Sequence, residues 1–337
     1  AYRESEFHLS GNSNQVEGQV GAYDGSSIVF AGKDNPENGT FRMSSPDAPA
    51  LVTGIEKEDE KHAPASITIK QNAIISNRTD TADTSYQDKE FTDVDSATLL
   101  AMTNGKITLN QAQGIYGNIM ADVDPDDTSE VKSKGGMIQL DVVPGGEVKG
   151  NVSAGHSGTV AMNLNQSLWQ GRATDQADAD HKGTVNLSLS NGAHWQMMGD
   201  SNLTSLSNTS SLVDMKANDK YQTLNVGKFR GQDGTFLMKT DLDSQKVHIA
   251  DAAVGSQGRV QVYDKSFVMG KEVTGVRNLL LITDKSKNAI FTGKSLDKGG
   301  IWDVTPTLQR GDTVKDAQGN IVGNRMVSDQ DRQDGEP

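Results

Sequence analysis

Three kinds of residue in this 337-residue sequence could take part in chemistry: a serine beside an aspartate, six histidines and a run of carboxylates. The serine is Ser201, in the triplet Gly199-Asp200-Ser201. Trypsin-like proteases need two glycines after such a serine to form the oxyanion hole, and an α/β-hydrolase needs Gly-x-Ser-x-Gly. Asn202 and Leu203 follow instead. The triplet is therefore interpreted as a turn between two strands.

The histidines and the acidic run do not form a recognisable metal site. No two histidines stand at metal-ligand spacing, and the chain has no cysteine, which argues against zinc and excludes disulfides. Asp122, Asp124, Asp126 and Asp127 suggest calcium, but Asp127 stands where an EF-hand needs glycine. A solvated acidic loop is the favoured interpretation, with weak calcium binding as the alternative. We expect no catalytic residue, no metal and no cofactor.

One further motif could bind a partner. Arg310-Gly311-Asp312 is a triplet that integrins capture through the arginine cation and the aspartate carboxylate when it is displayed at a loop tip. These three residues are a candidate integrin-type site. The alternative is that the tripeptide occurs by chance.

Composition limits the classes of partner. The net charge is −13, from 32 basic and 45 acidic residues, which argues against nucleic acid because phosphate binding needs clustered Lys and Arg. The mean hydropathy is −0.56, and no apolar run is long enough to span a bilayer. The first residues have neither the basic head nor the apolar region of a signal peptide.

The elements that must position these residues are short strands. Apolar and polar residues alternate with period two in nine segments bounded by Gly, Asn, Asp or Ser, as expected of strands and turns. The nine segments are residues 25–32, 65–75, 105–111, 135–143, 158–164, 183–189, 234–240, 258–264 and 277–283. No stretch carries the apolar stripe of a helix, so an all-β fold is predicted.

Two segments repeat each other along the chain. The stretches that begin at His156 and His181 both contain Gly-Thr-Val, an alternating strand, a tryptophan and a glycine. Self-similarity at about 20–30 residues is typical of solenoids, whose coils bury their apolar sides against one another. The sequence therefore predicts a right-handed parallel β-helix, a single-stranded pectin-lyase-like solenoid, with an antiparallel sandwich or barrel as the alternative. Polar insertions at 54–66, 77–98 and 121–136 are expected to leave the coils as loops.

Residues 183–303 resemble the C-terminal part of an autotransporter passenger of the pertactin and AIDA-type adhesin kind. The resemblance rests on an ordered set of motifs: Gly183-Thr184-Val185, Trp195, Gly199-Asp200-Ser201-x-Leu203-x-x-Leu206, Leu212-Val213-Asp214, Tyr221-x-Thr223-Leu224-x-Val226, Gly231-x-x-Gly234-Thr235-Phe236, Thr240-Asp241-Leu242, Gly258-Arg259-Val260 and Asn278-Leu279-Leu280-Leu281-Ile282. The family usually has Asp-x-Leu-x-Val after the Thr-Asp pair. This chain has Gln245-Lys246-Val247-His248-Ile249 there, so the aspartate is lost while the strand pattern remains.

The resemblance implies export through the outer membrane by the passenger's own C-terminal β-barrel (type V secretion), which we do not recognise within these residues. It divides the chain into a β-helix stem (1–182), last coils with a C-terminal β-cap that acts as an intramolecular chaperone (183–305), and a terminal segment (306–337). The cap residues that it implies are Trp195, Gly199, Leu203, Leu206, Leu224, Val226, Gly234, Phe236 and Asp241. Protease passengers of this family carry an N-terminal serine-protease domain, for which residues 1–180 supply no serine-centred motif.

The sequence thus predicts a bacterial surface adhesin passenger that is not an enzyme. We expect it to bind host extracellular-matrix proteins or glycans through a face of the β-helix, because a solenoid offers a long face where many weak polar contacts add up. Two alternatives stay open. One is self-association between cells, which drives aggregation and biofilm. The other is a polysaccharide lyase or hydrolase on the same scaffold, whose paired carboxylates cannot be located without the coil register.

Overall fold

The computed structural model describes residues 5–46, 49–54, 64–78, 96–123, 134–175, 182–217, 220–240, 245–263, 280–295, 308, 313–315 and 321–324. The chain divides into two compact units, Ala1–Ser188 and Leu189–Pro337, which are described separately below. Within the described ranges every long regular element is a β-strand. None of the described segments forms a helix with the length and apolarity needed to span a membrane.

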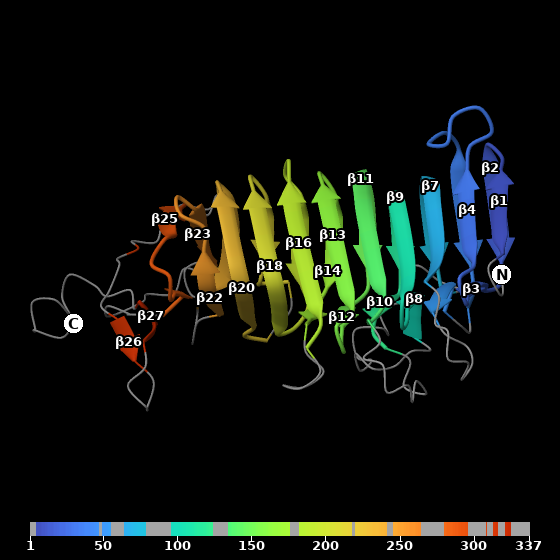
Figure 1. Cartoon of the computed structure of the whole chain (residues 1–337). Helices are drawn as coiled ribbons and strands as arrows, with labels where there is room; N and C mark the ends of the chain where they lie inside the picture. Colours follow the sequence, from blue (N-terminus) through green and yellow to red (C-terminus); the bar gives the residue numbers. More distant parts are fainter. Residues whose placement is uncertain are drawn as a thin grey trace, which may run out of the picture. The chain divides into compact units, whose positions relative to one another are not determined.

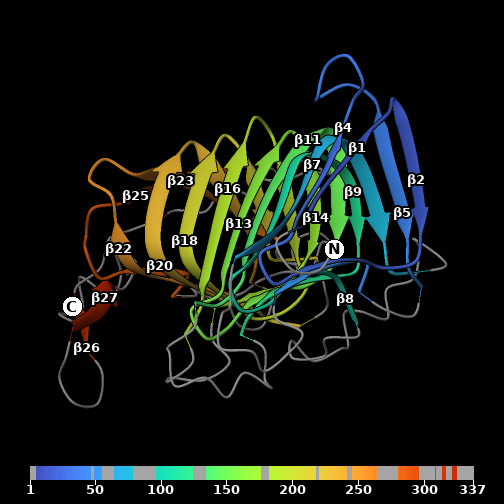
Figure 2. The same cartoon turned by 45° about the vertical axis from the view of Figure 1, so that its right-hand side comes forward.

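In the first unit the chain winds through two sheets, and successive coils pair in parallel (Figure 1 and Figure 2). The second sheet has six strands: β3 (Val20–Tyr23), β6 (Leu51–Gly54), β8 (Ala97–Ala101), β10 (Asn118–Ala121), β12 (Val152–Ala154) and β15 (Ala173–Thr174). The strands of the other, longer sheet in this unit are β1 (Glu6–Ser10), β2 (Ser13–Glu17), β4 (Ser27–Ala31), β5 (Thr40–Ser44), β7 (Ala65–Ser76), β9 (Gly105–Tyr116), β11 (Met137–Lys149), β13 (Thr159–Asn165), β14 (Leu168–Gly171) and the first residues of β16 (Thr184–Ser190). This arrangement confirms the predicted all-β parallel solenoid.

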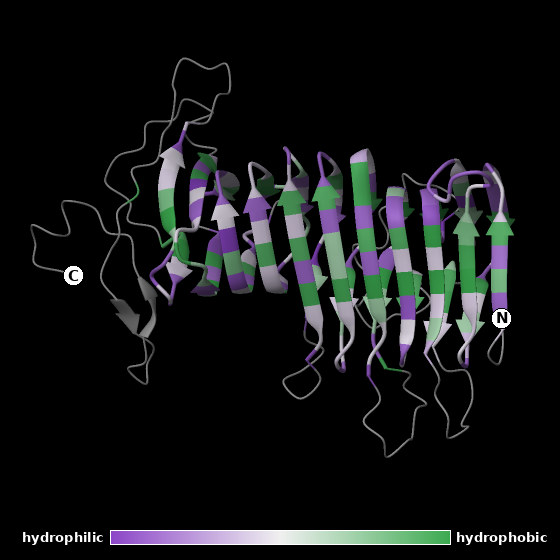
Figure 3. Cartoon of the chain, turned by 45° about the horizontal axis from the view of Figure 1, so that its top comes forward, coloured by the Kyte–Doolittle hydropathy of each residue, from purple (hydrophilic) through white to green (hydrophobic). Residues whose placement is uncertain are grey.

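The core consists of columns of inward-facing side chains that run from coil to coil. Figure 3 shows hydrophobic and hydrophilic bands alternating along the strands, which is the period-two pattern read from the sequence. The parallel register places similar side chains of successive coils directly above one another. One such column contains Ile28, Ile67, Ile107, Ile138 and Val160. All five are at most 5% exposed. Each buried side chain of this size contributes roughly 1.5–3 kcal/mol, so the columns supply much of the driving force for folding.

A column of glycines lets the chain turn tightly from the long sheet into the second sheet. Gly117, Gly150 and Gly171 hold this corner in successive coils. Gly117 directly precedes β10, and one residue separates Gly150 from β12 and Gly171 from β15. A Cβ atom on Gly150 would lie 1.9 Å from the carbonyl oxygen of Gly117, and one on Gly171 would lie 2.0 Å from that of Gly150. The coils approach so closely here that only glycine fits.

Asparagines follow these glycines and bond one coil to the next. The Oδ1 atom of Asn118 accepts a hydrogen bond from the backbone N–H of Asn151 at 2.9 Å. In turn, Oδ1 of Asn151 accepts the backbone N–H of Arg172 at 3.2 Å. Asn118 and Asn151 are 6% and 2% exposed, so their amides satisfy backbone donors that are out of reach of bulk water.

The Gly-Thr-Val repeat seen in the sequence marks a second tight corner. Here the chain leaves the second sheet and enters the long one. A Cβ atom on Gly158 would lie 2.2 Å from the carbonyl oxygen of Ala121, and one on Gly183 would lie 2.4 Å from that of Ala154. Ala121 and Ala154 are the last residues of β10 and β12. The repeat is therefore a steric requirement of this corner.

The second unit continues the parallel pattern with strands in two series. One series comprises β18 (Ser201–Thr209), β20 (Thr223–Gln232), β22 (Lys246–Ala252) and β24 (Ile282–Asp284). The other comprises β17 (His194–Met197), β19 (Leu212–Asp214), β21 (Gly234–Lys239), β23 (Gln257–Tyr263) and β25 (Ile290–Lys294). A separate antiparallel pair is formed by β26 (Thr313–Lys315) and β27 (Ile321–Asn324).

Candidate ligand-binding face

The outer face of β9 and β11 carries a cluster of an aromatic residue and two charged residues. Parallel pairing sets Gly114 opposite Glu147 and Tyr116 opposite Lys149. The intervening residues, Ile115 and Val148, are fully buried in the core. Because side chains alternate between the two faces of a strand, Tyr116, Glu147 and Lys149 point outward.

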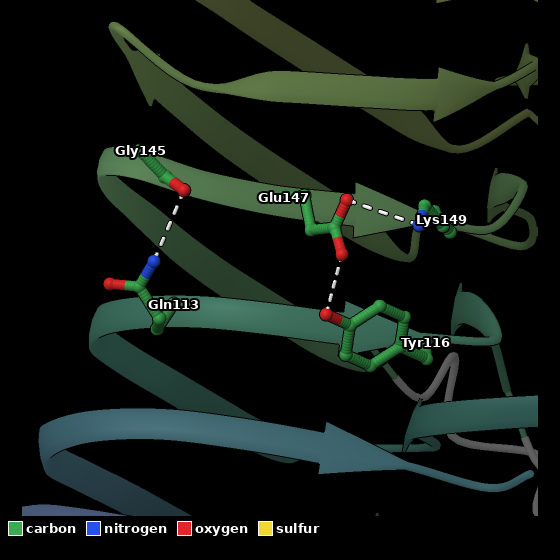
Figure 4. A network of polar contacts seen from close by, with 5 residues as sticks. All are labelled: Gln113, Tyr116, Gly145, Glu147 and Lys149. Atoms are coloured by element: carbon green, nitrogen blue, oxygen red, sulfur yellow. Dashed lines mark hydrogen bonds and ion pairs between the residues drawn. The ribbon is translucent and has the colours of Figure 1, made fainter. Parts of the chain in front are cut away.

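These three residues form a connected polar network (Figure 4). The hydroxyl of Tyr116 donates a hydrogen bond to Oε1 of Glu147 at 2.6 Å. The Nζ atom of Lys149 lies 3.2 Å from the other carboxylate oxygen of Glu147 and 5.7 Å from the centroid of the Tyr116 ring. Beside the network, Nε2 of Gln113 donates to the carbonyl oxygen of Gly145 at 3.1 Å. The five residues tie two neighbouring coils together on their outer surface.

The ring of Tyr116 lies across the strand that carries it. A Cβ atom on Gly114 would lie 2.9 Å from Cε2 of Tyr116, so the ring occupies the space that any larger side chain at residue 114 would need. The Gly-x-Tyr spacing therefore places a flat aromatic surface on the outside of β9.

Burial and Glu147 both favour the protonated form of the Tyr116 hydroxyl. Burial raises the pKa of this phenol well above its usual value of 10.0, and the hydrogen bond and the negative charge of Glu147 raise it further. The hydroxyl is thus a fixed donor to Glu147 at neutral pH, while the Glu147 and Lys149 side chains remain 30% and 27% exposed. The network offers a ligand an aromatic ring, a carboxylate and an ammonium group side by side.

Polar rows also line the outer face of the second unit. The Nδ2 atom of Asn225 donates to Oδ1 of Asn202 at 2.8 Å, across neighbouring coils. The next two coils continue this row with His248 and Thr283, whose Nδ1 and Oγ1 atoms lie 2.8 Å apart. Two pairs of equivalent positions on neighbouring coils are therefore joined by side-chain hydrogen bonds.

The environment of His248 in this row makes the stability of the fold depend on pH. Burial, and then the positive charges of Lys246 and Lys285, lower the pKa of His248 below its usual 6.5. The folded state therefore favours the neutral imidazole, and the stability that depends on it is present above pH 6.5 and is lost as the pH falls below it. We expect urea denaturation to show a smaller loss of stability on acidification in His248→Gln than in the wild type. His8→Gln, at a side chain that is 60% exposed, is the matched control; equal acid sensitivity of wild type and His248→Gln would contradict the assignment.

Gly199 and Asp200 lie between β17 and β18, where the sequence predicted a turn, whereas Ser201 is the first residue of β18. Its side chain is 0% exposed, and Oγ donates to the carbonyl oxygen of Gly199 at 3.0 Å. The neighbouring Asp200 accepts the backbone N–H of Thr223, on the next coil, at 2.7 Å. The triplet therefore closes the corner between β17 and β18.

The cap residues implied by the resemblance lie in the inward columns of the second unit. Trp195 and Phe236 share one column with Val213, and both are 0% exposed. Leu203 and Val226 share another. The remaining described members belong to the same strands or their corners, as Gly199, Leu206, Leu224 and Gly234. Asp241 lies outside the described residues, and the chaperone role stays a prediction.

Several other predicted sites also fall outside the described residues. These are Arg310, Gly311 and Asp312 of the integrin-type motif, and Asp124, Asp126 and Asp127 of the acidic run. Asp122 is described, and its Oδ1 lies 2.7 Å from Nδ1 of His156. Across the part of the chain that the structure describes, no group of three His, Asp or Glu side chains is arranged to hold a metal ion.

His156 lies at the start of one of the two repeated stretches. It occupies a tight turn, closed by a hydrogen bond from Gly158 N–H to the carbonyl oxygen of Gly155 at 2.6 Å. Both central residues, His156 and Ser157, have left-handed φ values of 40° and 67°. The carboxylate of Asp122 thus fastens a turn that has no central glycine.

The Tyr116 cluster was not found from the sequence. Its members come from two strands separated by a long polar insertion, so their proximity depends on the coil register. The Gly-x-Tyr spacing at 114–116 and the Glu-x-Lys spacing at 147–149 were visible in the sequence as same-face pairs. Only the parallel pairing of β9 with β11 brings the two pairs together.

A parallel β-solenoid with a polar outer face is the architecture expected of an autotransporter passenger, and the comparisons support that class. The chain is similar to two curated proteins, both named serine protease EspP, from Escherichia coli and from Escherichia coli O157:H7. Each is 26% identical over 165 residues, which covers 46% of this chain and 12% of the relative. No family model matches the chain. The distant similarity supports an autotransporter passenger that is secreted or displayed at the cell surface.

The comparison corrects one prediction. We predicted a protein that is not an enzyme, and this is wrong, because the named relatives are serine proteases. The prediction rested on the lack of a serine-centred motif in the sequence. The matched stretch spans only 12% of the relatives' own length, so the motifs within these residues do not decide whether the whole protein is catalytic.

Proposed function

We propose that this chain forms the β-helical part of a passenger that binds host extracellular-matrix proteins or glycans through its outer face. The observation that carries the proposal is the outward polar surface of the coils. It includes Asp141, which accepts a hydrogen bond from Asn163 on the next coil at 2.6 Å, and the Asn202–Asn225 row. Hydrogen-bonding groups repeated from coil to coil suit an extended ligand that makes many weak contacts.

A solid-phase binding panel tests this function. Purified chain is applied to immobilised fibronectin, laminin, collagen and a set of glycans, and bound protein is measured over a range of concentrations. Saturable binding to at least one matrix protein or glycan by monomeric chain is the expected result. Binding to none of them, together with settling of cells that display the chain, would favour self-association instead.

The integrin-type motif is tested in the same panel with integrin-bearing cells. If Arg310, Gly311 and Asp312 are recognised, Asp312→Glu should abolish attachment of integrin-bearing cells, because the longer side chain displaces the carboxylate from the integrin metal. The charge is unchanged, so a general electrostatic effect is controlled. Attachment that is equal for the wild type and Asp312→Glu would end the proposal for this motif.

The names of the relatives favour a second candidate function, proteolysis by the protein to which this chain belongs. Ser201 is fully buried, so we propose that any serine nucleophile lies elsewhere. Labelling with a fluorophosphonate probe tests this. Labelling that is equal in the wild type and Ser201→Ala supports a nucleophile at another position, whereas labelling lost in Ser201→Ala would contradict it.

A further inference from the structure

The Tyr116 network combines an aromatic surface with hydrogen-bonding groups in a way that fits a sugar ring. We propose that Tyr116, Glu147 and Lys149 form a subsite for one residue of a neutral pyranose glycan. The inference rests on the proposed function, since it names the ligand class and the place where it binds.

The Tyr116 ring is held in a fixed orientation on β9. A Cβ atom on Gly114 would lie 2.9 Å from Cε2 of Tyr116, so the ring packs against β9, and Nζ of Lys149 lies 5.7 Å from the ring centroid. The hydroxyl is held by Glu147 at 2.6 Å, which fixes the ring in its plane. A ring that is already ordered loses little conformational entropy when an apolar surface, such as the C–H face of a pyranose, packs on it.

The groups at the edge of the Tyr116 ring can form hydrogen bonds with sugar hydroxyls. The Glu147 carboxylate accepts hydrogen bonds and the Lys149 ammonium group donates them. A sugar hydroxyl is both donor and acceptor, so it pairs with either group. In the next coil, Gln170 is paired with Lys149 and extends the outward row. A glycan that follows the stacking direction would meet a polar side chain about every 4.8 Å.

The charges of the subsite favour a neutral ligand. Glu147 and Lys149 neutralise each other at 3.2 Å, so the subsite presents no net charge to a ligand. The whole chain carries −13, which disfavours uronates and sulfated sugars. A neutral hexose or N-acetylhexosamine is therefore the class of ligand that the site fits.

Isothermal titration of the full chain with defined tetrasaccharides tests the inference. The neutral probes are β-linked tetrasaccharides of glucose, galactose and N-acetylglucosamine, and a hyaluronan tetrasaccharide is the charged comparison. We expect at least one neutral probe to bind more tightly than hyaluronan. Tyr116→Ala should weaken that binding about tenfold, and Tyr116→Phe should retain most of it because the ring remains.

Two further variants keep the test independent of folding. Lys149→Gln keeps a polar outward side chain but shortens it and replaces the charged ammonium donor with a neutral amide, and it should weaken binding about fivefold. Tyr263→Ala removes another tyrosine whose ring lies 4.9 Å from a lysine Nζ, that of Lys216, and should leave the affinity unchanged. Melting curves establish that each variant is folded.

Several outcomes would overturn the inference. The first three are unchanged affinity in Tyr116→Ala and Lys149→Gln, equal loss in Tyr263→Ala, and preference for hyaluronan. Binding to matrix proteins without binding to any neutral tetrasaccharide would also overturn it, while the proposed function would stand. Failure to bind every protein and glycan in both assays would overturn the two together.

Discussion

Replacing Trp169 with alanine should lower the free energy of unfolding of the first unit by about 3–5 kcal/mol. The side chain is 0% exposed, and its Nε1–H donates to the carbonyl oxygen of Gly150 at 2.9 Å. Truncation leaves a large cavity and an unpaired carbonyl oxygen between two coils. Urea denaturation followed by circular dichroism measures the change.

The controls for this variant separate packing from other effects. Trp169→Phe keeps most of the apolar volume and loses only the hydrogen bond, so it should be destabilised by no more than half as much. Met137→Ala, at a side chain that is 44% exposed, should change stability by less than about 0.5 kcal/mol. If the free energy of unfolding of Trp169→Ala differs from that of the wild type by less than about 1 kcal/mol, as for a typical surface substitution, packing of the core does not depend on this indole.

Gly150→Ala should have the next largest effect, a loss of about 2–3 kcal/mol. The added methyl carbon would lie 1.9 Å from the carbonyl oxygen of Gly117, which is a backbone atom of a packed coil. Either the corner opens or the two coils separate locally. Differential scanning calorimetry of the variant should show a lower melting temperature of the first unit.

Gly145 supplies a matched comparison, because its requirement for glycine has a different origin. Its φ value is +76°, and a Cβ atom placed on it would meet nothing within 4 Å. Gly145→Ala should lose about 1–2 kcal/mol through the left-handed backbone alone, and Gly145→Asn should lose less because asparagine tolerates that conformation. Asparagine at residue 150 should be at least as damaging as alanine. The opposite order at residue 150 would refute the steric explanation.

The alternation of apolar and polar residues predicted many strands of the long sheet but not the short strands of the second sheet, and the internal repeat then predicted the solenoid. Period two defines which face of each strand is buried, and repetition of the pattern requires coils that bury one another, so Ile67 and Ile107 could be assigned to a core before their contact was known. The Gly-Thr-Val repeat was noticed as a pattern. Its glycine is required by the carbonyl oxygen of Ala121 or Ala154, and each of these residues precedes the glycine by a whole coil.

The candidate site could not be predicted in the same way. Tyr116 and Glu147 come together only when β9 and β11 are aligned, and a polar insertion of unknown path separates them in sequence. Ser201 shows the reverse case, since the residues that follow it were enough to reject a catalytic elbow. The enzyme prediction failed for a third reason, because it rested on motifs within a chain that matches the named serine proteases over only 12% of their length.

The stacked columns also determine where this chain can gain or lose residues during evolution. Deleting one residue inside β7 would turn every following side chain of that strand to the opposite face, and would place Thr68 and Lys70 in the two columns now filled by Ile67 and Ile69. A length change at a corner leaves both flanking strands in phase. Insertions should therefore accumulate between strands, so the loops can diversify in length and sequence while the register of the coils is inherited unchanged.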